Sequence, residues 1–344
     1  MITPEEEIVI VDLSESLLQR HSADSNSRKN KLQELSSDAI EEFLAYQKNI
    51  PSEWWALLVG WELRQMWSLC GTYIVISIFN LMLSIVTQMF VGRHLGTMAL
   101  AGASMATLEV QGFAFIVMLA DQLLVMFMCS FESWYSLGIV LSSAYFANTT
   151  VSVASFAICI NYLNLDLTFM LGMSTAAIIR VSTEIECANP RVARFSAMVV
   201  NATSILISII LSTIIIACGT TLGKAFIGDD EVIKAVSEFT PLLAISVFLN
   251  GVEPILSGVA TGIGRPGLVV CFYACNYYLI GLTVGFALGF MTYLGVAGIW
   301  WGVILGFSLQ TLVLVIVVAT TDWDKEVDKA FDRLKQRADE EILA

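Results

Sequence analysis

Long apolar stretches that are nearly free of charge recur along most of this 344-residue sequence, and they restrict its possible folds more than any other feature. A helix of about 20 apolar residues crosses a hydrocarbon layer of about 30 Å. Eight stretches are long enough: 66–91, 98–120, 122–146, 153–178, 196–218, 240–262, 267–290 and 295–319. Charged residues make up 14% of the chain, too few to cover the surface of a water-soluble protein. The sequence predicts an all-α integral membrane protein with about eight transmembrane helices.

The second and third stretches lack a clear separator, so residues 98–146 form either one over-long helix or a tight hairpin at Asp121 and Gln122. The distribution of Lys and Arg distinguishes the two, because cytoplasmic loops carry an excess of these residues. Eight spans with a cytoplasmic N-terminus place fifteen Lys and Arg inside and three outside. A single crossing at 98–146 gives eight inside and ten outside, which argues against a seven-span receptor. We therefore predict a multi-pass protein with both termini in the cytoplasm.

Four segments follow from this topology. Residues 1–60 are predicted to be a disordered or amphipathic cytoplasmic tail, with one short amphipathic stretch at Asp38–Tyr46. Residues 61–120 hold two spans and residues 121–320 hold six. Residues 321–344 are predicted to be a cytoplasmic tail of mixed acidic and basic residues.

Composition excludes several classes of function. The net charge of −13 disfavours nucleic-acid binding, which needs a basic face. With only His21 and His94, zinc chemistry and His-based catalysis lack their usual ligand or proton carrier. No arrangement of a nucleophile with a base is apparent. We therefore expect no enzyme activity, no metal and no cofactor, with the lipid bilayer as the surrounding partner.

Carboxylates are rare in the predicted spans, because each one costs about 2.5–3.5 kcal/mol at mid-membrane depth on insertion scales. They are Glu109, Glu132, Asp166 and Glu253, with Asp121 at the suspected hairpin. Such a cost is usually accepted only where a cavity or a partner needs the charge. We interpret these residues as candidates for a proton or cation site.

Glu132 is the leading candidate, since Ser130, Ser133, Trp134 and Tyr135 flank it. In a low-dielectric site of this composition the carboxyl is suited to reversible proton binding, with Tyr135 lining the same cavity. A structural hydrogen bond to a neighbouring helix is the alternative.

Two further spans carry polar residues that predict a cavity. Asn161 and Asn164 share one helix face, and Asp166 is rotated away from both, so that this span has two polar faces. A satisfied polar seam between helices is an equal alternative for the two Asn, and Asp166 could instead reach toward the headgroups.

On the later span, Pro254 follows Asn250 and Glu253 at mid-depth. Pro254 cannot donate a backbone hydrogen bond, so we predict a hinge there, with carbonyls freed to face a substrate path. A packing kink with Glu253 near a helix end is the alternative. The glycines at 258, 262 and 264 predict close helix packing or a hinge, of which close packing is the commoner.

Several motifs together resemble the plant detoxification efflux carriers of the multidrug and toxic compound extrusion (MATE) family, over about residues 65–335. They are Phe90-Val-Gly-Arg-His-Leu-Gly96, Leu100-Ala-Gly-Ala-Ser104, Phe131-Glu-Ser-Trp-Tyr135, Ile158-Cys-Ile-Asn-Tyr-Leu-Asn164, Arg180-Val-Ser-Thr-Glu184, Ala188-Asn-Pro190, Leu256-Ser-Gly-Val-Ala260, Gly295-Val-Ala-Gly-Ile-Trp-Trp-Gly302 and Thr321-Asp-Trp323. The stretch Glu186-Cys-Ala188 departs from the family's Gly-Ala-Gly before Asn189.

The resemblance implies a fold of twelve spans in two six-helix lobes, of which this chain has room for eight. Residues 121–320 would be the C-terminal lobe, and 61–120 would be what remains of the N-terminal lobe after the loss of four spans between Leu119 and Gln122. Glu132 falls where plant members carry the acidic residue held to bind the coupling proton. Asn250 stands where many relatives have a second acid, and Glu253 replaces the usual glutamine one turn on.

The resemblance also implies a function, namely exchange of small organic compounds such as flavonoids or xenobiotics for protons or sodium at a vacuolar or plasma membrane. The missing spans argue against transport by a monomer, because alternating access needs a second lobe opposite the site. The alternative is a non-transporting truncated member or an incomplete gene model, interacting with full-length carriers. Association with further copies is left open.

Overall fold

The computed structural model describes residues 37–46, 52–96, 99, 102–103, 134–142, 145 and 149–343. Every regular element in these ranges is a helix. The chain divides into two units, Met1–Trp61 and Glu62–Ala344. The prediction of an all-α membrane protein is confirmed by the helical content, the long apolar helices and the structural relative reported below.

In the first unit, helix α3 (Ser37–Tyr46) coincides with the amphipathic stretch predicted at Asp38–Tyr46. The ring of Phe43 lies 5.3 Å from that of Trp54, at the beginning of α4 (Ser52–Leu95). Helix α4 is continuous and passes into the second unit.

Six helical segments of the second unit are long and apolar enough to cross a membrane: Tyr73–Leu95, Val151–Glu186, Pro190–Gly219, Asp230–Gly262, Pro266–Met291 and Val296–Ala319. They correspond to six of the eight predicted spans. The other two, at 98–120 and 122–146, lie largely outside the described residues, although 134–142 is helical. The hairpin within residues 98–146 therefore stays a prediction.

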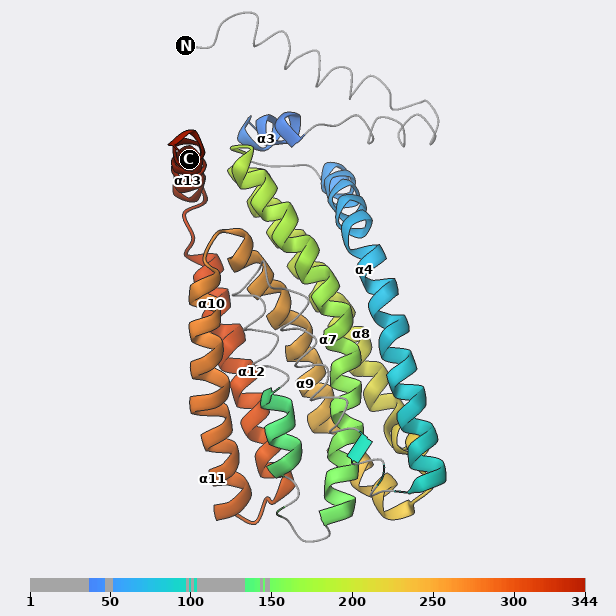
Figure 1. The fold of residues 1–344 in the computed structure, drawn as a ribbon. Coiled ribbons are helices and arrows are strands. Elements are labelled where there is room, and N and C mark those ends of the chain that lie inside the picture. The colour runs from blue at the N-terminus through green and yellow to red at the C-terminus, as the bar shows by residue number, and fades with distance from the viewer. Residues whose placement is uncertain are drawn as a thin grey trace, which may run out of the picture. The chain divides into compact units, whose positions relative to one another are not determined.

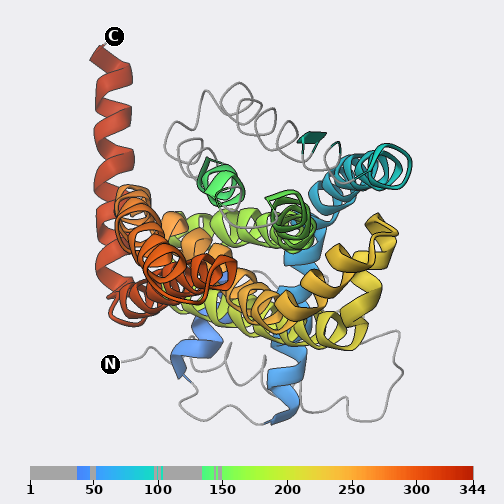
Figure 2. The same ribbon diagram turned by 90° about the horizontal axis from the view of Figure 1, so that it is seen from below.

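The helices of the second unit pass up and down a bundle (Figure 1). After α4 they are α7 (Thr149–Glu186), α8 (Pro190–Phe226), α9 (Asp230–Gly262), α10 (Pro266–Tyr273), η1 (Ala274–Leu282), α11 (Thr283–Met291), α12 (Val296–Ala319) and α13 (Trp323–Leu343). Helix α9 packs against α7, α8, α10 and α12 and occupies the centre of this arrangement (Figure 2). The segment η1 is a π-helix that continues α10 into α11.

Two sharp turns at the same end of the bundle have the same hydrogen bonds. After α7, the Asn189 N–H donates to the Glu184 carbonyl (2.8 Å) and the Ala188 N–H to that of Ile185 (3.1 Å). This Schellman pattern requires a left-handed residue after the helix, and Ala188 fills it with φ +62°. After α9, Gly264 takes the same position with φ +93°. Proline then begins α8 and α10, where its missing N–H has no helical partner to lose.

A buried ion cluster joins α4 to α7 near the first of these turns. Nε and Nη2 of Arg180 donate to the two carboxylate oxygens of Glu62, at 3.0 and 2.9 Å. Nη1 of Arg180 donates to Glu184 at 2.7 Å, and the Asn189 side chain donates to the other oxygen of Glu184 at 3.3 Å. The bidentate geometry and full hydrogen bonding allow these charges to be buried.

The predicted C-terminal tail contains helix α13, which runs crosswise to the spans along one edge of the bundle (Figures 1 and 2). Trp323 and Ala330 pack into the same apolar cluster as α7 and α8 residues. Glu326 is buried and accepts hydrogen bonds from Arg265 at 2.5 Å and Lys329 at 2.9 Å. Burial alone would raise the pKa of Glu326, but these hydrogen bonds and the attraction of the two cations hold that pKa below its ordinary value of 4.5.

We expect the substitution Glu326→Gln to reduce the pH dependence of folding stability at acidic pH. Because the folded-state pKa is depressed, the carboxylate stabilises the fold above its ordinary pKa of 4.5, and this contribution is lost as the pH falls through the folded-state pKa. In detergent at neutral pH, the wild type should unfold at a higher temperature than the variant. This difference in unfolding temperature should shrink as the pH falls. Replacement of exposed Asp328 by Asn is the control. A difference in unfolding temperature that does not change with pH would contradict a lowered pKa of Glu326.

Candidate functional site

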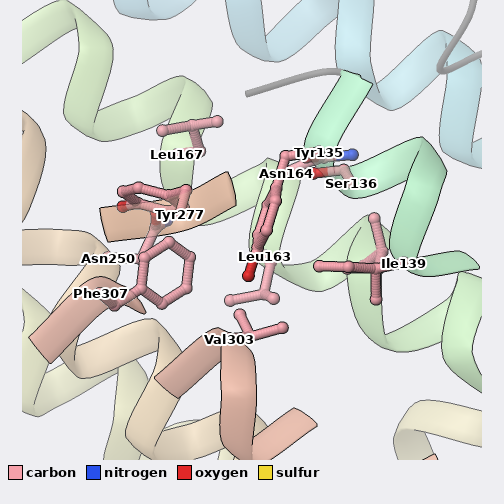
Figure 3. A pocket seen from close by; sticks show the side chains of 11 residues that line it. Tyr135, Ser136, Ile139, Leu163, Asn164, Leu167, Asn250, Tyr277, Val303 and Phe307 are labelled. Atoms are coloured by element: carbon pink, nitrogen blue, oxygen red, sulfur yellow. The ribbon is translucent and has the colours of Figure 1, made fainter. Parts of the chain in front are cut away.

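A pocket lies between the 134–142 helix, α7, α9, η1 and α12 (Figure 3). Its cavity volume is about 20 Å³, and its lining combines aromatic rings and aliphatic side chains with hydroxyl and carboxamide groups. The lining residues are Tyr135, Ser136, Ile139, Ile160, Leu163, Asn164, Leu167, Asn250, Tyr277, Val303 and Phe307. A mostly apolar wall with a few convergent polar groups is typical of sites for small organic molecules.

Three of the residues predicted to line a cavity do so, namely Tyr135, Asn164 and Asn250. They come from three separate elements, the 134–142 helix, α7 and α9. The Tyr135 ring meets that of Tyr277 edge-on, with centroids 5.2 Å apart. Glu132, the predicted proton carrier, lies outside the described residues, so its role stays a prediction.

Asn161 has a different environment from Asn164. Its Nδ2 donates to Oε1 of Gln88 on α4 at 2.6 Å, and its Oδ1 accepts from Nε2 of Gln88 at 3.2 Å. This reciprocal pair joins α4 to α7 and matches the polar seam that the sequence left open as an alternative. In a hydrocarbon environment such pairs provide the hydrogen bonds that lipid cannot.

Asp166 contacts α9 and is not among the residues that line the pocket. Nδ2 of Asn250 donates to Oδ2 of Asp166 at 2.9 Å, and both side chains are buried, at 4% and 2% exposure. Oδ1 of Asp166 is buried without a hydrogen-bond partner among the described residues. Asn250 therefore contacts both a buried carboxyl and the pocket.

Glu253, one turn after Asn250, belongs to a second polar group. Its Oε1 accepts a hydrogen bond from Ser257 at 2.7 Å. Gln310 of α12 interacts with the Glu253 carboxyl, although its Nε2 forms no hydrogen bond of normal geometry. Oε1 of Gln310 accepts from Asn276 of η1 at 2.8 Å, so the group links three elements.

Asn276 and Gln310 were missed in the sequence, where the available signal was an isolated carboxamide within an apolar span. The π-helical turn at Ala274–Leu282 was missed as well, and no residue pattern marked it. Its wider turn carries both Asn276 and the pocket residue Tyr277. Such local π-helical turns are frequent at functional sites.

Pro254 lies within α9, which continues as one helix from Asp230 to Gly262. Proline has no N–H, so the Asn250 carbonyl loses its usual helical donor. The Pro254 carbonyl accepts a hydrogen bond from Ser174 of α7 at 2.6 Å. A hinge at Pro254 stays a prediction.

Close packing of α7 and α9 holds the site together. An added Cβ at Gly258 would lie 2.7 Å from the Ser174 carbonyl oxygen, and one at Gly262 would lie 3.0 Å from that of Ile178. Close packing therefore accounts for these two glycines, whereas Gly264 forms the turn described above. No group of three or more His, Cys, Asp or Glu side chains is placed to hold a metal ion in the described ranges.

Comparisons with known proteins agree on one family. The MatE family model matches residues 125–287. Protein DETOXIFICATION 41 of Arabidopsis thaliana is 31% identical over 497 aligned positions, which cover 95% of this chain and 97% of that protein. Protein DETOXIFICATION 37 of the same plant is 41% identical over 209 positions, covering 61% of this chain and 42% of the relative.

Among solved structures, the crystal structure of the eukaryotic MATE transporter AtDTX14 is similar, with a TM-score of 0.59 and 27% sequence identity. The match covers 61% of this chain and 47% of that one. The alignment with DETOXIFICATION 41 has 497 positions against 344 residues here, so at least 153 positions of the relative have no counterpart. The predicted place of this gap, between Leu119 and Gln122, lies outside the described residues.

We expect Gly258→Ala to destabilise the fold, because the new methyl group would meet backbone atoms of Ser174 on α7. Overpacking of this kind costs about 1–3 kcal/mol. The matched control is Gly71→Ala on α4, where no described atom lies within 4 Å of the added Cβ. Unfolding of both variants in mixed micelles measures the difference, and equal stability of the two would rule out tight contact between α7 and α9.

Proposed function

Because this chain belongs to the MATE family of membrane transporters, we propose that it exchanges small organic molecules for protons across a membrane. The observation that carries the proposal is the pocket, which places aromatic rings and carboxamides between candidate membrane spans. A binding site within the membrane and between helices is the arrangement that secondary transporters use.

The lining of the pocket favours flat, amphipathic compounds of the flavonoid or xenobiotic kind, whose binding would require the helices to part beyond the present cavity of about 20 Å³. Tyr135, Tyr277 and Phe307 offer ring faces and edges for aromatic substrates. Asn164 and Asn250 offer donors and acceptors for hydroxyl or carbonyl groups. The relatives' names refer to detoxification, which agrees with export or vacuolar storage of such compounds.

The coupling carboxyl of this proposal is Glu132, three residues before the pocket residue Tyr135 in the sequence. On this mechanism the acidic side of the membrane protonates the site and releases substrate, and deprotonation on the cytoplasmic side restores it. The proposal also places the protein in a vacuolar or plasma membrane, with both termini in the cytoplasm.

Reconstitution into liposomes tests the proposal. With a pH gradient, we expect uptake of a fluorescent organic cation or a flavonoid above the level of empty liposomes. We expect Glu132→Gln to lower this uptake to that background, whereas Glu186→Gln, at the exposed last residue of α7, leaves it unchanged. Three results would contradict proton coupling through Glu132. They are uptake that does not depend on the pH gradient, uptake driven by a sodium gradient instead, and uptake that persists in Glu132→Gln.

A second candidate follows from the 153 or more positions that the alignment leaves without a counterpart. Alternating access needs two lobes that move against each other, and most of one is missing. The chain would then be a non-transporting partner of full-length carriers. Co-purification with a tagged full-length relative, together with loss of flux in isolation, supports this role. Full-length transcripts that carry coding sequence between Leu119 and Gln122 would instead show that the natural protein is longer.

A further inference from the structure

We propose that Asp166 of α7 is a second proton-binding residue, and that Asn250 links its protonation to the pocket. This inference rests on the proposed transport function but concerns a different residue from Glu132. Four observations carry it. Asp166 lies deep in its span, the described residues place no counter-charge beside it, one of its oxygens is unsatisfied, and its hydrogen-bond partner Asn250 also lines the pocket.

Asp166 lies deep within its span. The candidate span is Val151–Glu186, so Asp166 stands fifteen residues from one end and twenty from the other. At 1.5 Å per residue, these separations are about 22 and 30 Å. Its side chain is 4% exposed, so it does not reach the headgroup region as the sequence allowed.

The neighbouring helices supply no cation at this depth among the described residues. Their basic groups lie outside the candidate spans or near the span ends: Arg64, Arg93 and His94 of α4, Arg180 of α7, Arg191, Arg194 and Lys224 of α8, Lys234 of α9, and those of α13. Arg180 is engaged by Glu62 and Glu184. On the adjoining elements, the described titratable groups within the bundle include Glu253 of α9, Tyr162 of α7, Tyr135 and Tyr277, and none is a cation at neutral pH. An isolated anion here would be strongly disfavoured, and a bound proton removes the charge.

The two carboxyl oxygens differ in a way that fits one bound proton. Oδ2 accepts the 2.9 Å hydrogen bond from Asn250, whereas Oδ1 is buried with no partner among the described residues. We place the proton on Oδ1, because there it neutralises the charge and leaves the bond to Asn250 in place.

Asn250 connects this carboxyl to the pocket. It is 2% exposed and lines the pocket beside Tyr277 and Phe307 (Figure 3). An ionised Asp166 holds the Asn250 amide more tightly than a neutral one, because charge-assisted hydrogen bonds are about twice as strong. Protonation therefore weakens this hydrogen bond without breaking it, so that Asn250 is held less firmly in place for a pocket occupant, and proton binding opposes substrate binding as exchange requires.

Infrared difference spectroscopy on the full chain in lipid tests this inference without any substrate. We expect the wild type at neutral pH to show the carbonyl band of a protonated carboxylic acid. Labelling of aspartate with ¹³C at the carboxyl carbon should shift this band. The band should be lost in Asp166→Asn and kept in Glu253→Gln, a matched change at a buried carboxyl on α9. Asn250→Leu should shift the band, because its hydrogen bond is removed.

Several results would overturn the inference: no such band in the wild type, a band indifferent to the aspartate label, its survival in Asp166→Asn, or its disappearance when sodium replaces choline. If Asp166→Asn does not fold, Asp166→Glu replaces it and should carry a band that the aspartate label no longer shifts. The spectrum does not depend on flux. A chain with the band but no transport would therefore reject only the proposed function, and a transporting chain without it would reject only the role of Asp166.

Discussion

Lipid offers no hydrogen-bond partners, so polar side chains inside these spans depend on other parts of the protein for their hydrogen bonds. The seam between α7 and α9 shows this constraint most clearly. The Ser174 hydroxyl meets the Pro254 carbonyl, and the Asn250 amide meets Asp166. Gly258 and Gly262 allow the two backbones to approach closely enough for these contacts. The pocket lies beside this seam, so its shape depends on how the two helices pack.

A second consequence of the constraint appears between α4 and the rest of the bundle. The Gln88–Asn161 pair and the Glu62–Arg180–Glu184 cluster attach α4 to α7 at well-separated levels. Both contacts are polar, specific and largely buried. They give the motif Arg180-Val-Ser-Thr-Glu184 a structural role, which is to hold α4 against α7.

Hydropathy was enough to predict six spans and their approximate ends, because the cost of charge in lipid restricts composition over whole helices. It also identified the polar residues within them, including Asp166, Asn250 and Glu253. Their partners could not be predicted, since Gln88 and Asn161 are 73 residues apart and Asp166 and Asn250 are 84 apart. For Asn161 and Asn164 the sequence allowed either a seam or a cavity, and the structure places one residue in each. The π-helical turn depends on tertiary packing, which residue patterns do not encode, whereas helix α13 has an amphipathic pattern that the prediction of a tail did not use.

The central claim is that Asp166 and Asn250 form one functional unit across α7 and α9. A double-mutant cycle with Asp166→Leu and Asn250→Leu tests it most directly, through unfolding free energies measured in lipid or mixed micelles. The account predicts that the two substitutions are coupled by about 1 kcal/mol, within the range found for residues in direct contact. Effects that add to within about 0.3 kcal/mol would show that the two side chains act independently and would contradict it.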